Sequence, residues 1–286
     1  MSPDVSSDEI PQSLLEEIRE RIQDYFVPLL VISPGDRKVG AAGSGTLVEL
    51  AGKHYILTAK HVWSEVKRWE EIGLVLTGEG VPLAIPRDRI VAKLVGAGSA
   101  AGEWGPDLAL LELPPHLVGE VGARKSFLNL AREHSALSSH PPQLEKAVWA
   151  VIGLVGQSSE VGPPDNTGMA LAKLRGEAFF GWSCTADSRD DYDYLTLTAR
   201  TTLPGVPSSF AGVSGGGLWQ ITLGMKGSEI VWKGERRFRG VAFWQTPLPE
   251  DSIAIRCHGP RSIFEKAWNT WGLVAHGAGG DAREVH

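Results

Sequence analysis

The chain has 286 residues, of which 42% are hydrophobic and 22% are charged, and this composition excludes collagen-like, fibrous and wholly disordered proteins. Its length provides one large domain or two ordinary ones, each able to bury a full hydrophobic core. The 28 Lys and Arg residues against 34 Asp and Glu residues give a net charge of -6, which disfavours a protein that binds nucleic acid through its phosphates.

The N-terminal residues 1–12 are polar and acidic, unlike a signal peptide, and we expect them to form a mobile tail. The apolar run over residues 27–32 is too short to cross a membrane, and no later run comes closer. The two cysteines, Cys184 and Cys257, are too few for a disulfide framework or a four-thiolate zinc site. These features predict a cytoplasmic protein with buried thiols and no membrane contact.

The first predicted element is a helix, because Ser13 and Glu16 have the spacing of a capping box. Apolar side chains then repeat at helical spacing at Leu14, Leu15, Ile18, Ile22 and Tyr25. We therefore predict an amphipathic helix over residues 13–26. This helix either braces a barrel with its apolar face or docks a regulatory partner protein, and the sequence leaves both interpretations open.

From residue 27 onward, short β-prone runs are separated by Gly and Pro, a texture typical of a barrel or sandwich of short strands. The runs in the first half are VPLLVIS, GTLVEL, HYILTA, GLVLT, RIVAKLVG and LALLEL. Residues 114–142 show no obvious strand and have room for one or two helical turns, so we interpret them as a connector.

A second series of β-prone runs follows the connector: VWAVIGLVG, EAFFGW, YLTLTAR, LWQITL, EIVWKG and RGVAFWQT. Another capping box, Ser262 with Glu265, predicts a C-terminal helix before a frayed Gly-rich end. Two strand series around one connector predict two β-domains in tandem, with a helix at each end. The predicted boundaries are 1–37 for the tail, helix and lead-in strand, 38–136 and 137–258 for the two β-domains, and 259–286 for the C-terminal helix and tail.

Two residues have the placement of an acid–base pair. His61 ends an apolar run at a predicted strand-to-helix boundary, and Asp107 directly precedes the apolar run LALLEL. A carboxylate at the mouth of such a strand is partly desolvated and needs a partner such as an imidazole. The residues alone also allow a packing histidine and an aspartate that closes the turn begun by Gly105 and Pro106.

The segment FAGVSGGGLW places Ser214 between glycines. These glycines permit a backbone shape that exposes the hydroxyl and gathers N–H groups into a concavity able to stabilise an oxyanion. A phosphate loop would need Lys and Ser or Thr after the glycines, and a nucleophile elbow would need a helix after the serine. The following run LWQITL supplies neither, and a plain flexible turn would leave the embedded serine unexplained.

Four segments together resemble the chymotrypsin-like (trypsin-like) serine peptidases, and more closely the disulfide-free bacterial branch that includes the HtrA-type proteases. They are GSGTLV from Gly43, LTAKHV around His61, DLALL from Asp107 and GVSGG around Ser214, in the order of that family. The resemblance covers residues 39–271 and leaves the N-terminal helix unexplained. It implies an all-β fold of two tandem six-stranded antiparallel β-barrels.

The resemblance also implies the chemistry of the site. His61, Asp107 and Ser214 would form a triad that cleaves a peptide bond through an acyl-enzyme, with a protein or peptide as substrate and without a metal or another cofactor. The backbone N–H groups of Gly212 and Ser214 would form the oxyanion hole.

The chain departs from this family around the substrate pocket. Val213 stands where zymogens have an acid, so activation by N-terminal cleavage is not expected. Ser208 stands at the base of the S1 pocket, which implies an uncharged P1 residue. Trp244 matches the family, whereas Phe243 replaces a Ser that often supports the acid and Gln245 replaces a Gly that opens the pocket. These residues imply a narrower pocket and a less supported catalytic acid.

We therefore predict an intracellular trypsin-like serine endopeptidase that binds neither nucleic acid nor a membrane. The alternative is a latent or non-catalytic protein of the same fold that docks a partner or holds a peptide as an added strand. An esterase on an α/β-hydrolase fold would need a parallel sheet with alternating helices, which the pattern lacks. The Asp-rich residues 187–194 lack the Gly and Glu of an EF-hand, so we predict a solvated loop there.

Overall fold

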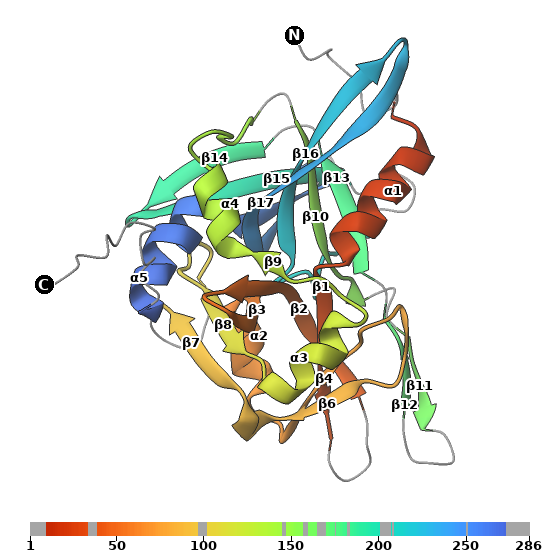
Figure 1. Ribbon diagram of the computed structural model, residues 1–286, viewed down its shortest axis with the longest axis vertical. Helices are drawn as coiled ribbons and strands as arrows, with labels where there is room; N and C mark the ends of the chain where they lie inside the picture. Colours follow the sequence, from red (N-terminus) through yellow and green to blue (C-terminus); the bar gives the residue numbers. More distant parts are fainter. Residues whose placement is uncertain are drawn as a thin grey trace, which may run out of the picture.

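The computed structural model describes residues 10–33, 39–96, 102–144, 147–156, 160–164, 170–174, 176–181, 184–200, 207, 209–249 and 251–272. Most of residues 1–12 and the Gly-rich end, for which a mobile tail and fraying were predicted, therefore lie outside the described residues. Figure 1 shows two curled sheets, one above the other in the view, with α1 and the C-terminal helix packed on their outside. None of the helices in the described ranges is long and apolar enough to cross a membrane.

The first sheet holds the N-terminal half of the chain. Its strands are β1 (Phe26–Ile32), β2 (Val39–Leu50), β3 (Lys53–Thr58), β4 (Glu71–Leu74), β6 (Leu83–Pro86), β7 (Val91–Val95) and β8 (Leu108–Glu112), in the order β6-β4-β1-β2-β3-β8-β7. The two outer strands, β6 and β7, are joined by the short helix η2 (Arg87–Arg89) and Ile90. Because so few residues separate them, the two ends of the sheet lie close together and the sheet is curled into a barrel. Counted as one interrupted strand, β6 and β7 give this barrel six strands.

The second sheet repeats this arrangement in the C-terminal half. Its strands are β10 (Val148–Leu154), β13 (Gly176–Gly181), β14 (Cys184–Arg189), β15 (Tyr192–Arg200), β16 (Gly217–Lys226), β17 (Glu229–Leu248) and β18 (Ser252–His258), in the order β13-β10-β16-β17-β18-β15-β14. The outer strands β13 and β14 are again consecutive in the chain. A small third sheet joins β11 (Glu160–Pro164) and β12 (Ala170–Lys173) to β5 (Glu79–Gly80) of the first half.

The predicted all-β fold of two tandem chymotrypsin-like barrels is thus confirmed, with several differences in detail. The runs EIVWKG and RGVAFWQT belong to one long strand, β17, and β14 and β18 were not predicted. The connector contains α3 (Pro115–Gly122), α4 (Leu130–Ala136) and a two-residue strand, β9 (Leu128–Asn129), which pairs with β2. The domain boundaries after residues 37, 136 and 258 remain a proposal.

Both predicted terminal helices are present, but neither predicted capping box forms. Helix α1 spans Gln12–Gln23, Pro11 is its N-cap, and no side chain caps it, so Ser13 lies inside the first turn. The C-terminal segment comprises η4 (Ser262–Ala267) and α5 (Trp268–Trp271). Its leading N–H groups, those of Arg261 and Ser262, donate to the carboxylate of Asp193, at 3.1 and 2.6 Å. The cap is therefore supplied by β15 of the second barrel rather than by Ser262 and Glu265.

Buried strands explain the continuous apolar runs of the sequence. Successive side chains of a strand point to opposite faces, so a strand with two buried faces has no polar positions. In β8, Ala109 and Leu111 fill the first barrel, whereas Leu108 and Leu110 face a separate cluster that joins the two barrels. We call this the interface cluster. It also includes side chains from α1, β10, β16 and the C-terminal segment, among them Ile18, Ile22, Ala150, Trp219, Phe264 and Trp268.

Candidate active site

His61 and Asp107 meet because of the way β3 pairs with β8. The pairing is antiparallel, with Thr58 opposite Ala109, so the end of β3 lies beside the start of β8. His61 is the second residue of α2 (Lys60–Val66), which begins after β3, and Asp107 immediately precedes β8. The sequence thus places the imidazole and the carboxylate at one edge of the first barrel.

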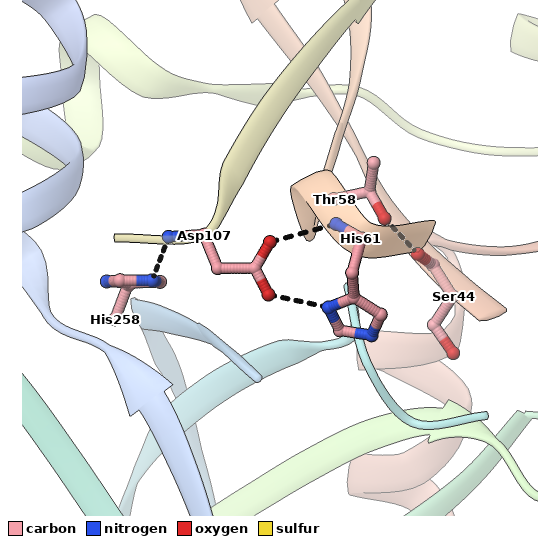
Figure 2. A network of polar contacts seen from close by, with 5 residues as sticks. All are labelled: Ser44, Thr58, His61, Asp107 and His258. Atoms are coloured by element: carbon pink, nitrogen blue, oxygen red, sulfur yellow. Dashed lines mark hydrogen bonds and ion pairs between the residues drawn. The ribbon is translucent and has the colours of Figure 1, made fainter. Parts of the chain in front are cut away.

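The two side chains form a directed pair (Figure 2). His61 Nδ1 lies 2.5 Å from Asp107 Oδ2, and the His61 backbone N–H donates to Asp107 Oδ1 at 2.9 Å. The Asp107 residue is 2% exposed, whereas the His61 side chain is 32% exposed. An ionised carboxylate only accepts hydrogen bonds, so it keeps the imidazole proton on Nδ1 and leaves Nε2 as the basic nitrogen.

A second histidine, His258, binds the backbone of Asp107 on the side away from His61. The sequence analysis did not predict a role for this residue. The backbone N–H of Asp107 donates to His258 Nε2 at 3.0 Å (Figure 2). His258 is fully buried at the end of β18, and this desolvation lowers its pKa to about 3. The ring is therefore neutral and carries its proton on Nδ1. The sequence predicted that Phe243 leaves the acid less supported; in the structure Phe243 stacks on His258, with ring centroids 4.2 Å apart.

The nucleophile loop, residues 210–216, carries Ser214 between β15 and β16. Gly212 and Gly215 have φ angles of 99° and 92°, which glycine adopts without the steric cost that other residues meet. The chain also approaches its neighbours closely here, since a Cβ at Gly215 would lie 1.9 Å from the backbone oxygen of Ser44. The glycines around Ser214 are therefore required both by backbone angle and by space.

Most N–H groups of the nucleophile loop already have acceptors. Val213, Gly215 and Gly216 donate to backbone oxygens at 2.7–3.0 Å. Within the described ranges, the N–H groups of Gly212 and Ser214 have no acceptor. These are the two groups predicted for the oxyanion hole.

A cavity of about 390 Å³ lies beside Ser214. His61 and Ser214 both line it, together with Phe210, Ala211, Val213, Ala242, Phe243, Trp244, Gln245 and Ile255. The structure therefore brings together the predicted triad and three of the predicted pocket residues, whereas Ser208 lies outside the described residues. Among the described residues, no hydrogen bond joins His61 Nε2 to Ser214 Oγ. In unliganded enzymes this kind of contact often forms fully only when substrate binds.

Gln245 of β17 is one of the residues that line this cavity. Its side-chain oxygen accepts the N–H of Phe210 at 2.8 Å, and its amide nitrogen lies 3.4 Å from Ser209 Oγ. The side chain thus bridges β17 and the nucleophile loop where the sequence predicted a narrowed pocket. Apart from His61, the described residues that line the cavity carry no ionisable side chain.

Comparison with known proteins gives little further information. No family model matches the chain, and no curated protein matches its sequence. Among solved structures, the active form of the Rv3671c protease of M. tuberculosis is 15% identical with a TM-score of 0.47, and the alignment covers 96% of this chain and 94% of that one. A chain from a study of the disordered VPg protein of Sesbania mosaic virus is 14% identical with a TM-score of 0.41, covering 84% and 94%. Likenesses this distant do not bear on function.

Proposed function

We propose that the protein is a serine endopeptidase that works through an acyl-enzyme. The observation that supports this most strongly is that His61, which is hydrogen-bonded to Asp107, lines one cavity with Ser214. Within the described ranges, the N–H groups of Gly212 and Ser214 in the adjoining loop have no acceptor. A packing histidine or a turn-closing aspartate would not require this combination.

In the proposed reaction, Ser214 Oγ attacks the carbonyl carbon of a peptide bond while His61 Nε2 accepts the hydroxyl proton. The carbonyl oxygen becomes an oxyanion, which receives hydrogen bonds from the N–H groups of Gly212 and Ser214. The C–N bond then breaks, and His61 passes the proton to the leaving amine. Asp107 stabilises the imidazolium and keeps its own charge throughout. Water then attacks the acyl-enzyme through the same steps, with His61 as the base, and releases the second product.

The walls of the cavity favour a P1 side chain without charge, because desolvating a charged group against apolar walls is costly. The proposal also includes a reducing, cytoplasmic compartment, since Cys184 and Cys257 are free thiols, both buried.

The alternative is a protein that binds peptides without cleaving them, and two observations favour it. The described residues show no hydrogen bond between His61 and Ser214, and the Gln245 side chain, which lines the cavity, is hydrogen-bonded to Phe210. Such a protein would use the same cleft to hold an extended peptide.

A peptide library separates the two proposals. Wild-type protein and Ser214→Ala are incubated with the library, and mass spectrometry identifies new termini. We expect cleavage after uncharged residues by wild type and none by Ser214→Ala. Peptides that are retained equally by both proteins, without new termini, would support the binding protein instead.

A further inference from the structure

Ser44 lies in β2 of the first barrel, yet it contacts the nucleophile loop of the second. It is fully buried, and it belongs to the segment GSGTLV rather than to the predicted triad. We infer that Ser44 is a positioning residue that fixes the peptide groups of the oxyanion hole. This inference rests on the proposed function, because it concerns the same site.

Each polar group of Ser44 has a partner. Its hydroxyl donates to the backbone oxygen of Gly212 and accepts the N–H of Leu154, both at 2.7 Å. Its own N–H donates to the backbone oxygen of Ser214 at 2.8 Å. Its carbonyl accepts the hydroxyl of Thr58 at 2.6 Å, as Figure 2 shows. One residue thus holds two of the loop's carbonyl groups.

These carbonyls belong to the peptides that follow the two oxyanion peptides, Gly212–Val213 and Ser214–Gly215. An oxyanion N–H is oriented by the carbonyl of its own peptide, because a trans peptide is planar and its C=O and N–H point in opposite directions. The N–H of Gly212 belongs to the peptide of Ala211, whose oxygen accepts the N–H of Gly156 at 3.0 Å. The N–H of Ser214 belongs to the peptide of Val213, whose oxygen accepts the N–H of Gly216 at 2.8 Å. Both oxyanion N–H groups are therefore aimed by a bond on the far side of their own peptide.

The Ser44 hydroxyl links the end of β10, close to Gly156, to the nucleophile loop. On one side it binds Leu154, two residues before Gly156, and on the other it binds the carbonyl of Gly212, between the two oxyanion peptides. Without it, the carbonyl of Gly212 loses this donor, and the backbone at residue 212 is held less firmly, because glycine tolerates both signs of φ. Loss of this one hydroxyl should therefore disorder the oxyanion hole without touching His61 or Asp107.

The hydroxyl of Ser44 lies close to Gly153. A Cβ at Gly153 would lie 3.1 Å from Ser44 Oγ, so glycine at that position leaves room for the hydroxyl. Alanine removes the hydroxyl and cysteine keeps a group of similar shape with a weaker donor. Thr46, two residues along β2 and 2% exposed, makes no hydrogen bond to the nucleophile loop in the described ranges, so Thr46→Val is the matched control.

The test compares wild type, Ser44→Ala and Thr46→Val in their reaction with a fluorophosphonate at Ser214. We expect the second-order rate to fall about 10- to 100-fold in Ser44→Ala, since loss of one oxyanion donor costs about 100- to 1000-fold and here the donors are misplaced rather than removed. Thr46→Val should stay within about twofold of wild type. The ³¹P signal of the adduct reports the hydrogen bonds to the phosphonyl oxygen, and it should shift only in Ser44→Ala.

Several results would overturn the inference. An unchanged rate and ³¹P signal in Ser44→Ala would do so, as would equal losses in Ser44→Ala and Thr46→Val, which would indicate general destabilisation. If Ser44→Ala does not fold, Ser44→Cys replaces it, and a wild-type rate in that variant contradicts the inference.

A backbone measurement separates this inference from the proposed function. If wild type does not react at Ser214, the proposed function fails, and the amide NMR signals of Gly212 and Ser214 then decide about Ser44. Shifted or broadened signals in Ser44→Ala support the positioning role, and unchanged signals overturn it.

Discussion

The buried ring of His258 makes the stability of this protein depend on pH in a way that one substitution can remove. The folded protein holds this histidine neutral, with its pKa lowered to about 3 from 6.5 because the ring is fully buried. Between these two values the unfolded chain binds a proton that the folded protein does not bind. The free energy of unfolding therefore falls as the pH falls from 6.5 toward 3.

The expected slope in that window is about 1.4 kcal/mol for each pH unit, which amounts to about 2 kcal/mol between neutral pH and pH 5. In His258→Gln the side-chain oxygen can still accept the N–H of Asp107, but no group at this position titrates. The variant is expected to be less stable than wild type at pH 7.5, because the stacking on Phe243 is lost, and the difference should shrink as the pH falls.

Urea unfolding at pH 7.5, 6 and 5 measures these slopes directly. His116→Gln, on the exposed face of α3, is the matched control and should follow wild type. Equal pH slopes for wild type and His258→Gln would refute the argument that a neutral buried imidazole supports the backbone of Asp107.

Three further changes test the supports of the fold and the pocket. Ile18→Ala in α1 should lower the free energy of unfolding by about 2–5 kcal/mol, because this side chain is fully buried in the interface cluster; an effect below about 1 kcal/mol in chemical denaturation would favour a docking role for α1 over a brace. Asp193→Ala should cost about 1–2 kcal/mol by removing the cap of the C-terminal segment, seen as a lower Tm, and an unchanged Tm would contradict that role. Gln245→Gly should lower KM for peptides with large P1 residues by opening the cavity, and equal KM values across P1 sizes would show that the bridge does not limit access.

The sequence was sufficient for the fold class because its signal is repeated in each half of the chain. Runs such as LALLEL mark strands with two buried faces, and the glycines around Ser214 mark a backbone that other residues cannot adopt. The sequence was less informative about where helices begin and how they are capped. The predicted capping boxes at Ser13 and Ser262 were wrong. Helix α1 begins at Gln12 and has no side-chain cap, and Asp193, 69 residues away from Ser262, supplies the cap of the C-terminal segment.

The residues that hold the candidate site were harder to predict than those that line it. His258 was missed because β18 had not been predicted, so nothing placed this histidine behind Asp107. Ser44 was read only as part of a family segment, since its partner Gly212 lies 168 residues away. Such contacts depend on how two barrels pack together, which no periodicity within one strand reveals.

The most direct test of the proposed function is labelling with a fluorophosphonate probe, followed by mass spectrometry to locate the adduct in wild type, Ser214→Ala and His61→Ala. We expect one adduct on Ser214 in wild type and none in either variant. Folded wild-type protein that remains unlabelled, or an adduct that persists without His61, would contradict the assignment of His61, Asp107 and Ser214 as a working triad.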